Sequence, residues 1–160
     1  MQQLAQEPFH AVIKFPAMHV GVRTEAERIA EIAYLPFSVP LLEPANRLAA
    51  RAVRQFERYL ADPDVGFDLP LAQVGSKFQR KVWDAICGIP RGKTATYGAV
   101  AKALRSAPRA VGQACGSNWF PLVIPCHRVV ASGGLGGFGH HGAGFHLEIK
   151  RWLLAHEKAL

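Results

Sequence analysis

The segment 61–75 restricts the possible folds of this chain more than any other feature. It holds two prolines, two glycines and three aspartates, and these residues favour turns and interrupt helices and strands. A length of 160 residues suffices for two small domains that each have a core. We therefore predict an α+β protein, with a small α+β domain at 1–72 and a mostly helical domain at 73–160.

Charge is distributed unequally between the two parts of the chain. Residues 1–75 carry 7 Lys/Arg against 9 Asp/Glu, whereas residues 76–160 carry 12 against 3. Such a basic half favours a polyanionic partner, most simply nucleic acid. A generally basic surface is the alternative that charge alone leaves open.

Several function classes conflict with the composition. No run of about 18 apolar residues exists, so we expect no membrane span, and the N-terminus has no secretory signal pattern. Three cysteines, an odd number, do not make a disulfide framework. These features predict a reducing, cytoplasmic setting.

The first part reads as strands followed by a helix. Residues 9–15 and 18–23 have strand composition, and 28–35 reads as a further strand although helix is also open. A helix is expected at about 44–61, because Pro44 suits a first turn and apolar residues recur every four positions.

The second part reads as short helices around a cysteine loop. We expect helices at 77–87, 97–104, 108–115 and 147–158, with Ser76 and Thr96 as N-caps. The first should bury an apolar face of Phe78, Val82, Ala85 and Ile86, and the last should bury Ile149, Trp152, Leu153 and His156. The pair at 97–115 is a helix-turn-helix candidate. A buried strand is expected at 122–124, and a glycine-rich loop at 132–144.

Cys126 is the candidate nucleophile, in the run Pro125-Cys126-His127-Arg128. Thiolate is the reactive form, and neighbouring positive charge or a histidine base favours it. The alternative is a small apolar residue buried in the chain, with the polar neighbours outside.

Five ordered motifs extend this observation. They are FQRKVW at 78–83, IPRGKTATY at 89–97, RAVG at 109–112 with Asn118 beyond it, IPCHRV at 124–129 and WLLAHE at 152–157. Together they resemble the O6-alkylguanine-DNA alkyltransferases, also called methylated-DNA–protein-cysteine methyltransferases. The resemblance covers residues 76–160 well and residues 1–75 weakly.

The resemblance implies DNA repair by direct alkyl transfer from O6-alkylguanine in duplex DNA to the protein's own cysteine. O4-alkylthymine is a further candidate lesion. Each protein would act once, as a monomer, without cofactor or metal and without a membrane. Cys126 would accept the alkyl group and His127 would take its proton through a water. Glu157 would hold His127, and Asn118 would bond the turn that carries Cys126.

The resemblance also assigns residues to DNA and to the base. Arg109 would fill the gap left by the extruded nucleotide, and Tyr97 would crowd its phosphate. The remaining DNA-binding candidates are Gln79, Thr96, Ala110, Gly112 and Ser132. The candidates for the substrate pocket are Val129, Phe138 and Gly139.

Some residues depart from the family pattern. The loop after Cys126 is longer than usual, and Trp119 stands where proline is common. Residues 1–75 contain no cysteine, so we expect no N-terminal zinc site. His140, His141 and His146 are not expected to converge on a metal.

Three other functions are alternatives to alkyl transfer. A non-enzymatic protein that binds alkylated DNA would carry tryptophan in place of Cys126. A transcription regulator would use the helix-turn-helix but normally pairs it with a sensor or a dimer helix. A cysteine hydrolase would need an acyl pocket, for which we find no pattern.

Overall fold

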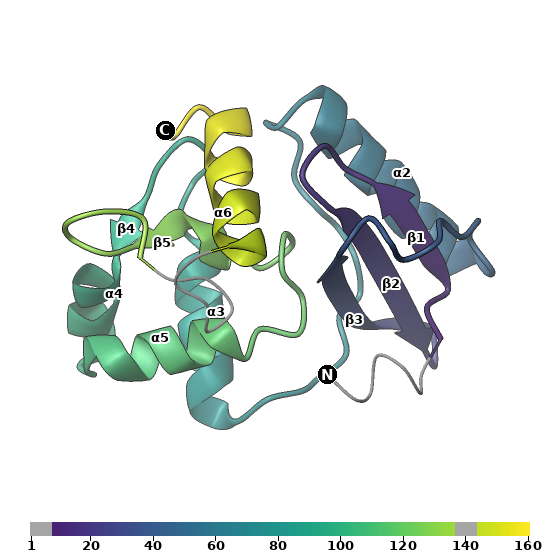
Figure 1. The fold of residues 1–160 in the computed structure, drawn as a ribbon. Coiled ribbons are helices and arrows are strands. Elements are labelled where there is room, and N and C mark those ends of the chain that lie inside the picture. The colour runs from purple at the N-terminus through teal and green to yellow at the C-terminus, as the bar shows by residue number, and fades with distance from the viewer. Residues whose placement is uncertain (1–7, 137–143) are drawn as a thin grey trace. The chain divides into compact units, whose positions relative to one another are not determined.

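A computed structural model describes residues 8–136 and 144–160 of the chain (Figure 1). The chain divides into two compact units, Met1–Gln73 and Val74–Leu160. Both helices and small sheets are present, as the mixed class predicted. None of the described helices is long and apolar enough to cross a membrane.

The first unit contains an antiparallel three-stranded sheet in the order β1-β2-β3. Its strands are β1 (Ala11–Lys14), β2 (His19–Glu25) and β3 (Arg28–Leu35). The third segment, for which helix was open, is a strand. Ile29, Ala30, Ile32 and Leu35 are buried on it, and a β-bulge at Ala30, between the pairs Arg23–Glu31 and Thr24–Ile29, interrupts the alternation of its two faces.

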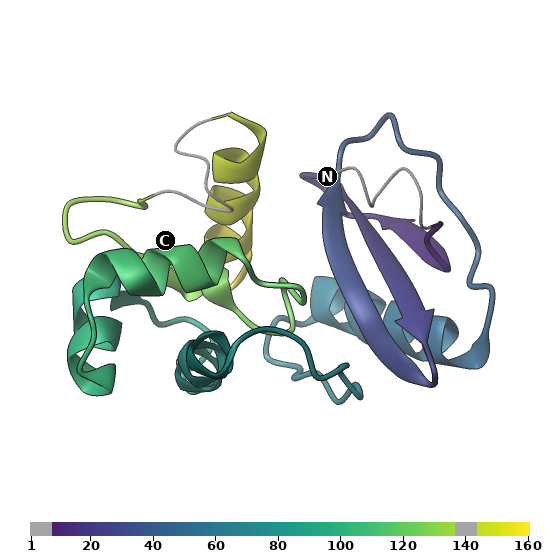
Figure 2. The same cartoon turned by 90° about the horizontal axis from the view of Figure 1, so that it is seen from below.

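The helix α2 (Arg47–Ala61) lies against one face of this sheet (Figure 2). The predicted start at Pro44 is wrong, because Asn46 is the N-cap and accepts a 2.8 Å hydrogen bond from the backbone N–H of Ala49. Phe56 on its buried face meets Phe15 edge to face, with ring centroids 6.4 Å apart.

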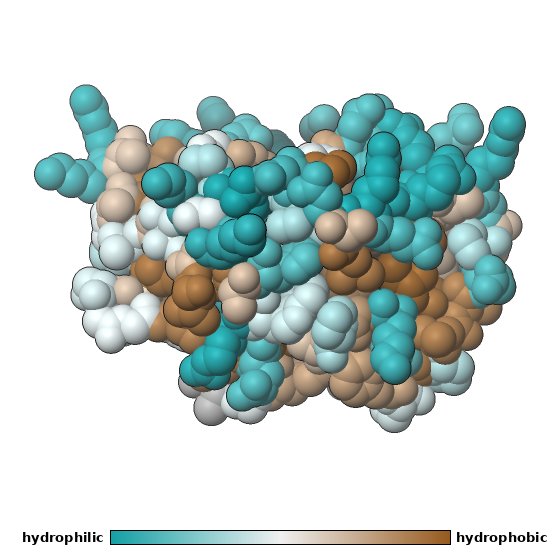
Figure 3. All heavy atoms as spheres, turned by 90° about the horizontal axis from the view of Figure 1, so that it is seen from above, coloured by the Kyte–Doolittle hydropathy of each residue, from teal (hydrophilic) through white to brown (hydrophobic). Residues whose placement is uncertain are grey.

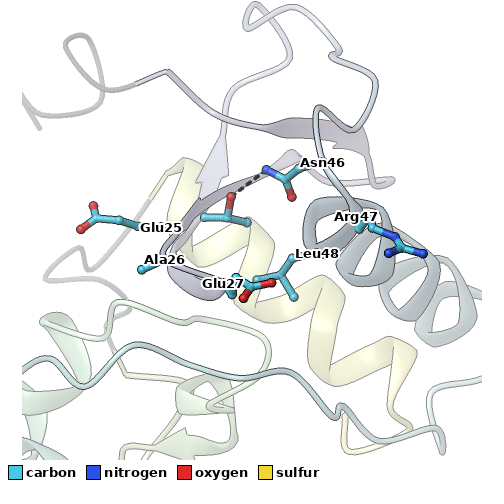
Figure 4. Close-up of a pocket in the computed structure, with 7 residues that line it drawn as sticks. Glu25, Ala26, Glu27, Asn46, Arg47 and Leu48 are labelled. Atoms are coloured by element: carbon cyan, nitrogen blue, oxygen red, sulfur yellow. Dashed lines mark hydrogen bonds between the residues drawn. The ribbon is translucent and has the colours of Figure 1, made fainter.

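The start of α2 and the turn after β2 enclose a hollow of about 480 Å³ (Figure 4). Asn46 also donates a 2.8 Å hydrogen bond to Thr24 Oγ1, so one side chain caps the helix and fastens it to the strand. The other lining residues are Glu25, Ala26, Glu27, Arg47 and Leu48. Of the predicted site residues, none lines this hollow.

The second unit begins with α3 (Lys77–Cys87), whose start is closed by a capping box between Ser76 and Gln79. The helix buries Val82, Trp83 and Ile86, and the indole of Trp83 donates a 2.9 Å hydrogen bond to Ala114 O. The predicted burial of Phe78 is wrong, since 37% of this residue is exposed. The inward face is centred on Trp83 instead.

Two short helices follow, α4 (Tyr97–Leu104) and α5 (Pro108–Gly116), and they contact each other (Figure 1). Thr96 caps α4 as predicted, through a hydrogen bond from the Ala99 N–H. Arg105 ends that helix with φ 55. The segment before α4, β4 (Ala95–Thr96), pairs in parallel with β5 (Val129–Val130) and so ties the helices to the cysteine loop.

The predicted strand at 122–124 is wrong. Residues 122–123 form a turn in which Leu122 has φ 78. Pro121 and Pro125 flank this apolar run, and proline lacks the N–H that a strand ladder needs. Leu122 and Ile124 are nonetheless buried.

The last helix is α6 (Phe145–His156). Ile149 and Leu153 are buried on it as predicted, whereas Trp152 and His156 are only half-buried. Their rings stack on each other at 4.8 Å between centroids. Lys150 is also buried, although it was not among the residues predicted to be buried on this helix.

Candidate active site

Cys126 opens a single 3-10 turn, η1 (Cys126–Arg128). Its backbone N–H donates to Ile124 O at 2.8 Å, and only 3% of the residue is exposed. The turn at 122–123 and the strand β5 hold this segment on both sides. The thiol therefore lies at a fixed, nearly buried position.

Asn118 fastens the loop that carries Cys126. Its Nδ2 donates to Ile124 O at 2.9 Å and to Cys126 Sγ at 3.2 Å, while its Oδ1 accepts from the Phe120 N–H at 2.8 Å. One amide thus bonds both ends of the loop and the sulfur. Trp119, the departure from the family pattern, is 40% exposed and leaves these bonds intact.

His127 and Glu157 form a fully buried pair. His127 Nε2 and Glu157 Oε2 are 2.8 Å apart, and neither side chain is exposed. A carboxylate can only accept, so Nε2 carries the hydrogen and Nδ1 keeps its lone pair. Nδ1 is buried and has no hydrogen-bond partner among the described residues.

Arg128 completes the surroundings of Glu157. Its Nε donates to Oε1 at 2.9 Å, its Nη2 donates to Oε2 at 3.1 Å, and its Nη1 donates to Ile89 O at 2.7 Å. The bidentate bond balances the buried carboxylate. Burial lowers the pKa of His127, against the opposing effect of Glu157, so the imidazole is neutral near pH 7.

The prediction that His127 and Arg128 favour the Cys126 thiolate is wrong, because Arg128 and His127 Nε2 both bond to Glu157. The pKa of the Cys126 thiol lies well above its usual value, since the thiol hydrogen-bonds to Cys115 and is buried. The donated bond from Asn118 opposes this shift. The resting residue is therefore a thiol that must lose its proton when it reacts.

Lys150 is a buried cation of this site that the sequence did not reveal. Its Nζ donates to Val129 O at 2.8 Å and lies 5.6 Å from the centre of the Tyr97 ring. Burial lowers the pKa of Lys150 to about 8 and raises the pKa of Tyr97 to about 12. The one available signal was its place beside Ile149 on the inward side of a helix.

The DNA-binding candidates lie at varied positions. Arg109 and Ser132 are exposed, and Ala110 is half-buried. A Cβ added at Gly112 would meet no described atom within 4 Å. Gln79 and Thr96 each have a structural task, because both side chains cap helices.

The pocket candidates are only partly described. Val129 is fully buried in β5, whereas Phe138 and Gly139 lie outside the described residues, as do His140 and His141. Among the described residues, no three His, Cys, Asp or Glu side chains gather so that they could hold a metal ion.

A buried thiol next in the chain to a histidine that is bonded to a buried carboxylate is an arrangement typical of proteins with a cysteine nucleophile. Comparison with known families makes the class specific. Residues 77–159 match the family described as "6-O-methylguanine DNA methyltransferase, DNA binding domain". The chain belongs to this family, which confirms the predicted resemblance.

Individual relatives agree with this assignment. The chain is 44% identical over 149 residues to a methylated-DNA–protein-cysteine methyltransferase of Mycolicibacterium paratuberculosis, and the match covers 87% of each. It is also 44% identical over 99 residues to regulatory protein ada of Salmonella typhimurium. That match covers 60% of this chain but only 28% of the relative.

Solved structures share the fold. The crystal structure of Mycobacterium tuberculosis O6-methylguanine methyltransferase has a TM-score of 0.79 and 30% identity, and the match covers 95% of this chain and 94% of that one. A Mycobacterium tuberculosis structure described as OGT in complex with DNA has a TM-score of 0.77 and 31% identity, covering 92% and 91%.

Proposed function

We propose that this protein repairs DNA by moving an alkyl group from O6-alkylguanine to the sulfur of its own Cys126, once per molecule. Membership of the methyltransferase family and 44% identity to a methylated-DNA–protein-cysteine methyltransferase support the reaction. The observation that assigns it to Cys126 is the contact of this buried thiol with Asn118, in the turn that also positions His127 against Glu157.

The reaction requires that the thiol lose its proton. Sulfur forms a bond to the alkyl carbon, the bond from that carbon to O6 breaks, and its electron pair remains on guanine. His127 Nδ1 takes the thiol proton through a water, because the Nε2–H is directed to Glu157. The buried carboxylate stabilises the imidazolium that results.

Arg128 keeps the Glu157 carboxylate ionised, so that it can stabilise the imidazolium. Two guanidinium bonds favour the ionised form of Glu157 even though the group is buried. The ion pair leaves His127 neutral at rest and still able to gain a proton during the reaction. The acceptor, the base and its carboxylate partner thus form one positioned unit.

Binding to duplex DNA rests on α4 and α5, which act as a helix-turn-helix in this proposal. Arg109 is exposed at the start of α5 and would enter the gap left by the extruded base. Gly112 lies three residues further on, on the same helix face, and allows close approach of the DNA. Ala110 lies off this face, so its expected contact is weaker.

The remaining assignments follow the family. Tyr97 reaches the site from the start of α4, and Val129, Phe138 and Gly139 line the base pocket. Residues 1–72 and 73–160 act as separate domains, and the protein works as a monomer. A reducing cytoplasmic location suits its three free cysteines. A non-enzymatic lesion-binding role is not favoured, because Cys126 is present.

Stoichiometry tests the proposal. A duplex that contains O6-methylguanine is added in excess, and methyl transfer is followed until it stops. We expect one methyl group per protein molecule, none with Cys126→Ser, and an unchanged amount with Cys87→Ser. Continued turnover beyond one equivalent would contradict the self-alkylating mechanism.

A further inference from the structure

The turn at 89–93, which joins α3 to β4, contacts the main chain of Glu157. Arg91 Nη1 donates a 3.4 Å hydrogen bond to Glu157 O. Gly92 is also close, because a Cβ added to it would lie 3.4 Å from the same oxygen. The carboxylate of the same glutamate is bonded to His127. The turn therefore holds the main chain of a residue whose side chain belongs to the active site.

The shape of this turn follows from its residues. The Lys93 N–H donates to Pro90 O at 3.1 Å and closes the turn, in which Gly92 has φ 86. A positive φ at the third position of a four-residue turn favours glycine, which adopts it without strain. Arg91 precedes this glycine, so its side chain starts from a defined point of a closed turn.

The main chain of Glu157 is fixed as well, because this residue is the C-cap of α6. Its N–H donates to Leu153 O at 3.0 Å, and Lys158 beyond it has φ 61. A left-handed residue in this place is a common way for a helix to end. The last carbonyl groups of a helix carry partial negative charge, so the Arg91 cation is favourable beside Glu157 O.

Arg128 connects the same turn to the carboxylate. Its Nη1 donates to Ile89 O at 2.7 Å, while its Nε and Nη2 donate to the Glu157 carboxylate at 2.9 and 3.1 Å. The turn thus reaches Glu157 by two routes, one to the main-chain oxygen and one to the side chain. A displacement of the turn would move the carboxylate relative to His127.

We infer that Arg91 is a positioning residue for alkyl transfer, which holds Glu157 so that its carboxylate meets His127 Nε2. The inference rests on the proposed function, in which His127 takes the thiol proton and Glu157 stabilises the imidazolium. The bond between these two side chains is 2.8 Å long, and a small shift of the carboxylate weakens it. Arg91 acts through Glu157 and not on the reacting atoms.

Transfer from free O6-benzylguanine to Cys126 tests this role without duplex DNA. Arg91→Met keeps an unbranched side chain but removes the donors, and we expect it to slow single-turnover transfer by about tenfold. Arg91→Lys keeps a cation and a donor and should recover part of the loss. The matched control is Arg151→Met, because Arg151 is an exposed arginine of α6 that pairs with Glu148. This control should transfer at the parent rate.

A double variant separates positioning from a general structural role. In a His127→Gln background there is no imidazole for the carboxylate to meet, so the position of Glu157 should no longer matter. Arg91→Met should therefore slow transfer far less in that background than in the parent, because residues that act as a unit are not additive. A loss of equal size in both backgrounds would overturn the inference.

The Nε2–H of His127 provides a readout that needs no alkyl substrate. This hydrogen lies in a buried bond to Glu157, so proton NMR of the full chain should show it as a slowly exchanging signal. We expect its exchange with water to be about tenfold faster in Arg91→Met than in the parent, and unchanged in Arg151→Met. Circular dichroism establishes that each variant is folded, and Arg91→Lys serves as the second variant.

The two measurements distinguish the inference from the proposed function. Unchanged exchange of the His127 hydrogen in folded Arg91→Met would overturn the positioning role, whether or not the parent transfers an alkyl group. A parent that transfers no benzyl group to Cys126 would overturn the proposed function instead, and faster exchange in Arg91→Met would still show that Arg91 holds Glu157 against His127.

Discussion

Glu157 bonds to two consecutive residues of the cysteine turn, His127 and Arg128. It is buried, yet it accepts from His127 and twice from Arg128. A buried carboxylate would be costly without such partners. Because Arg128 balances its charge, Glu157 can fix the His127 tautomer and still stabilise an imidazolium. In the proposed mechanism, the reactivity of Cys126 therefore depends on residues that do not touch its sulfur.

The His127–Glu157 unit leads to a kinetic prediction. His127→Gln and Glu157→Gln should each slow methyl transfer by about 100-fold, while affinity for alkylated DNA stays nearly unchanged. The double variant should lose little more than the worse single variant. Single-turnover rates and DNA-binding titrations check this. Losses that add strictly in log rate would count against a coupled unit.

The pH dependence of transfer has a defined sign. Because burial lowers the pKa of His127 below its usual 6.5, the base stays neutral above that value. The rate should fall only when the pH drops below 6.5. Glu157 opposes the shift, so Glu157→Gln should move the fall to still lower pH. A fall centred above pH 6.5 would contradict the assignment.

The lowered pKa of Lys150 predicts how the stability of the protein depends on pH. Its pKa is about 8 in the folded protein against 10.5 usually, so the unfolded chain binds more protons between these values. Stability from this group is therefore fully present above pH 10.5 and is lost as the pH falls to 8, by about 1 kcal/mol per pH unit. Urea unfolding of the parent and Lys150→Met from pH 7 to 10 should show the parent gaining relative to the variant above pH 8. A constant difference would contradict the prediction.

Among the elements, the turn between β2 and β3 is the clearest case of local strain. Glu25 pairs with Arg28, so only Ala26 and Glu27 form the turn. They have φ of 49 and 60, in the left-handed region. A two-residue turn of this kind normally uses Asn-Gly, because both positions need positive φ. The strands could be predicted from their pattern, but this turn could not, since neither residue signals it.

Replacing the turn residues should stabilise the protein. Ala26→Asn with Glu27→Gly should raise the free energy of unfolding by about 1 kcal/mol, because left-handed φ costs these residues little. Glu43→Gly, at an exposed loop position without positive φ, is the matched control and should be slightly destabilising. Urea unfolding measures both. A stabilising control, or an unstable double variant, would reject the explanation.

The cysteine turn shows how far the sequence could predict the site. The motifs identified Cys126, His127, Glu157 and Asn118, and the structure brings all four together. The predicted positive charge of the two neighbours His127 and Arg128 around the sulfur was wrong, because consecutive residues of a 3-10 turn point about 120° apart. His127 Nε2 and the Arg128 guanidinium therefore bond to Glu157 rather than to the Cys126 sulfur. Residues that are adjacent in the sequence therefore did not place their charged groups at the sulfur.

At the scale of the whole molecule, the basic charge is a surface property of the second half. Nine of the twelve Lys/Arg in residues 76–160 are exposed, whereas Arg128 and Lys150 serve the site internally. Hydrophilic side chains also cover much of one face of the molecule, with apolar areas between them (Figure 3). The exposed cations are available to neutralise phosphates.

DNA binding and base extrusion should separate in two variants. Lys93→Ala should weaken binding to all duplexes similarly and flatten the salt dependence, because each phosphate contact releases counterions. Arg109→Ala should slow repair of duplex DNA far more than transfer from free O6-benzylguanine, which needs no extrusion. Arg151→Ala, an exposed arginine of α6, is the control and should affect neither. Equal slowing of both substrates by Arg109→Ala would make Arg109 a general electrostatic residue.

Locating the methyl group tests the central claim most directly. The protein is incubated with O6-methylguanine duplex under reducing conditions, digested, and its cysteine peptides are weighed. The proposed mechanism predicts one added methyl group on the peptide that contains Cys126, and none on those that contain Cys87 or Cys115. Cys115 makes this a sharp test, because its thiol influences the pKa of Cys126 and is therefore a candidate competitor. Methylation of Cys115 with Cys126 left free would contradict the assignment of the acceptor.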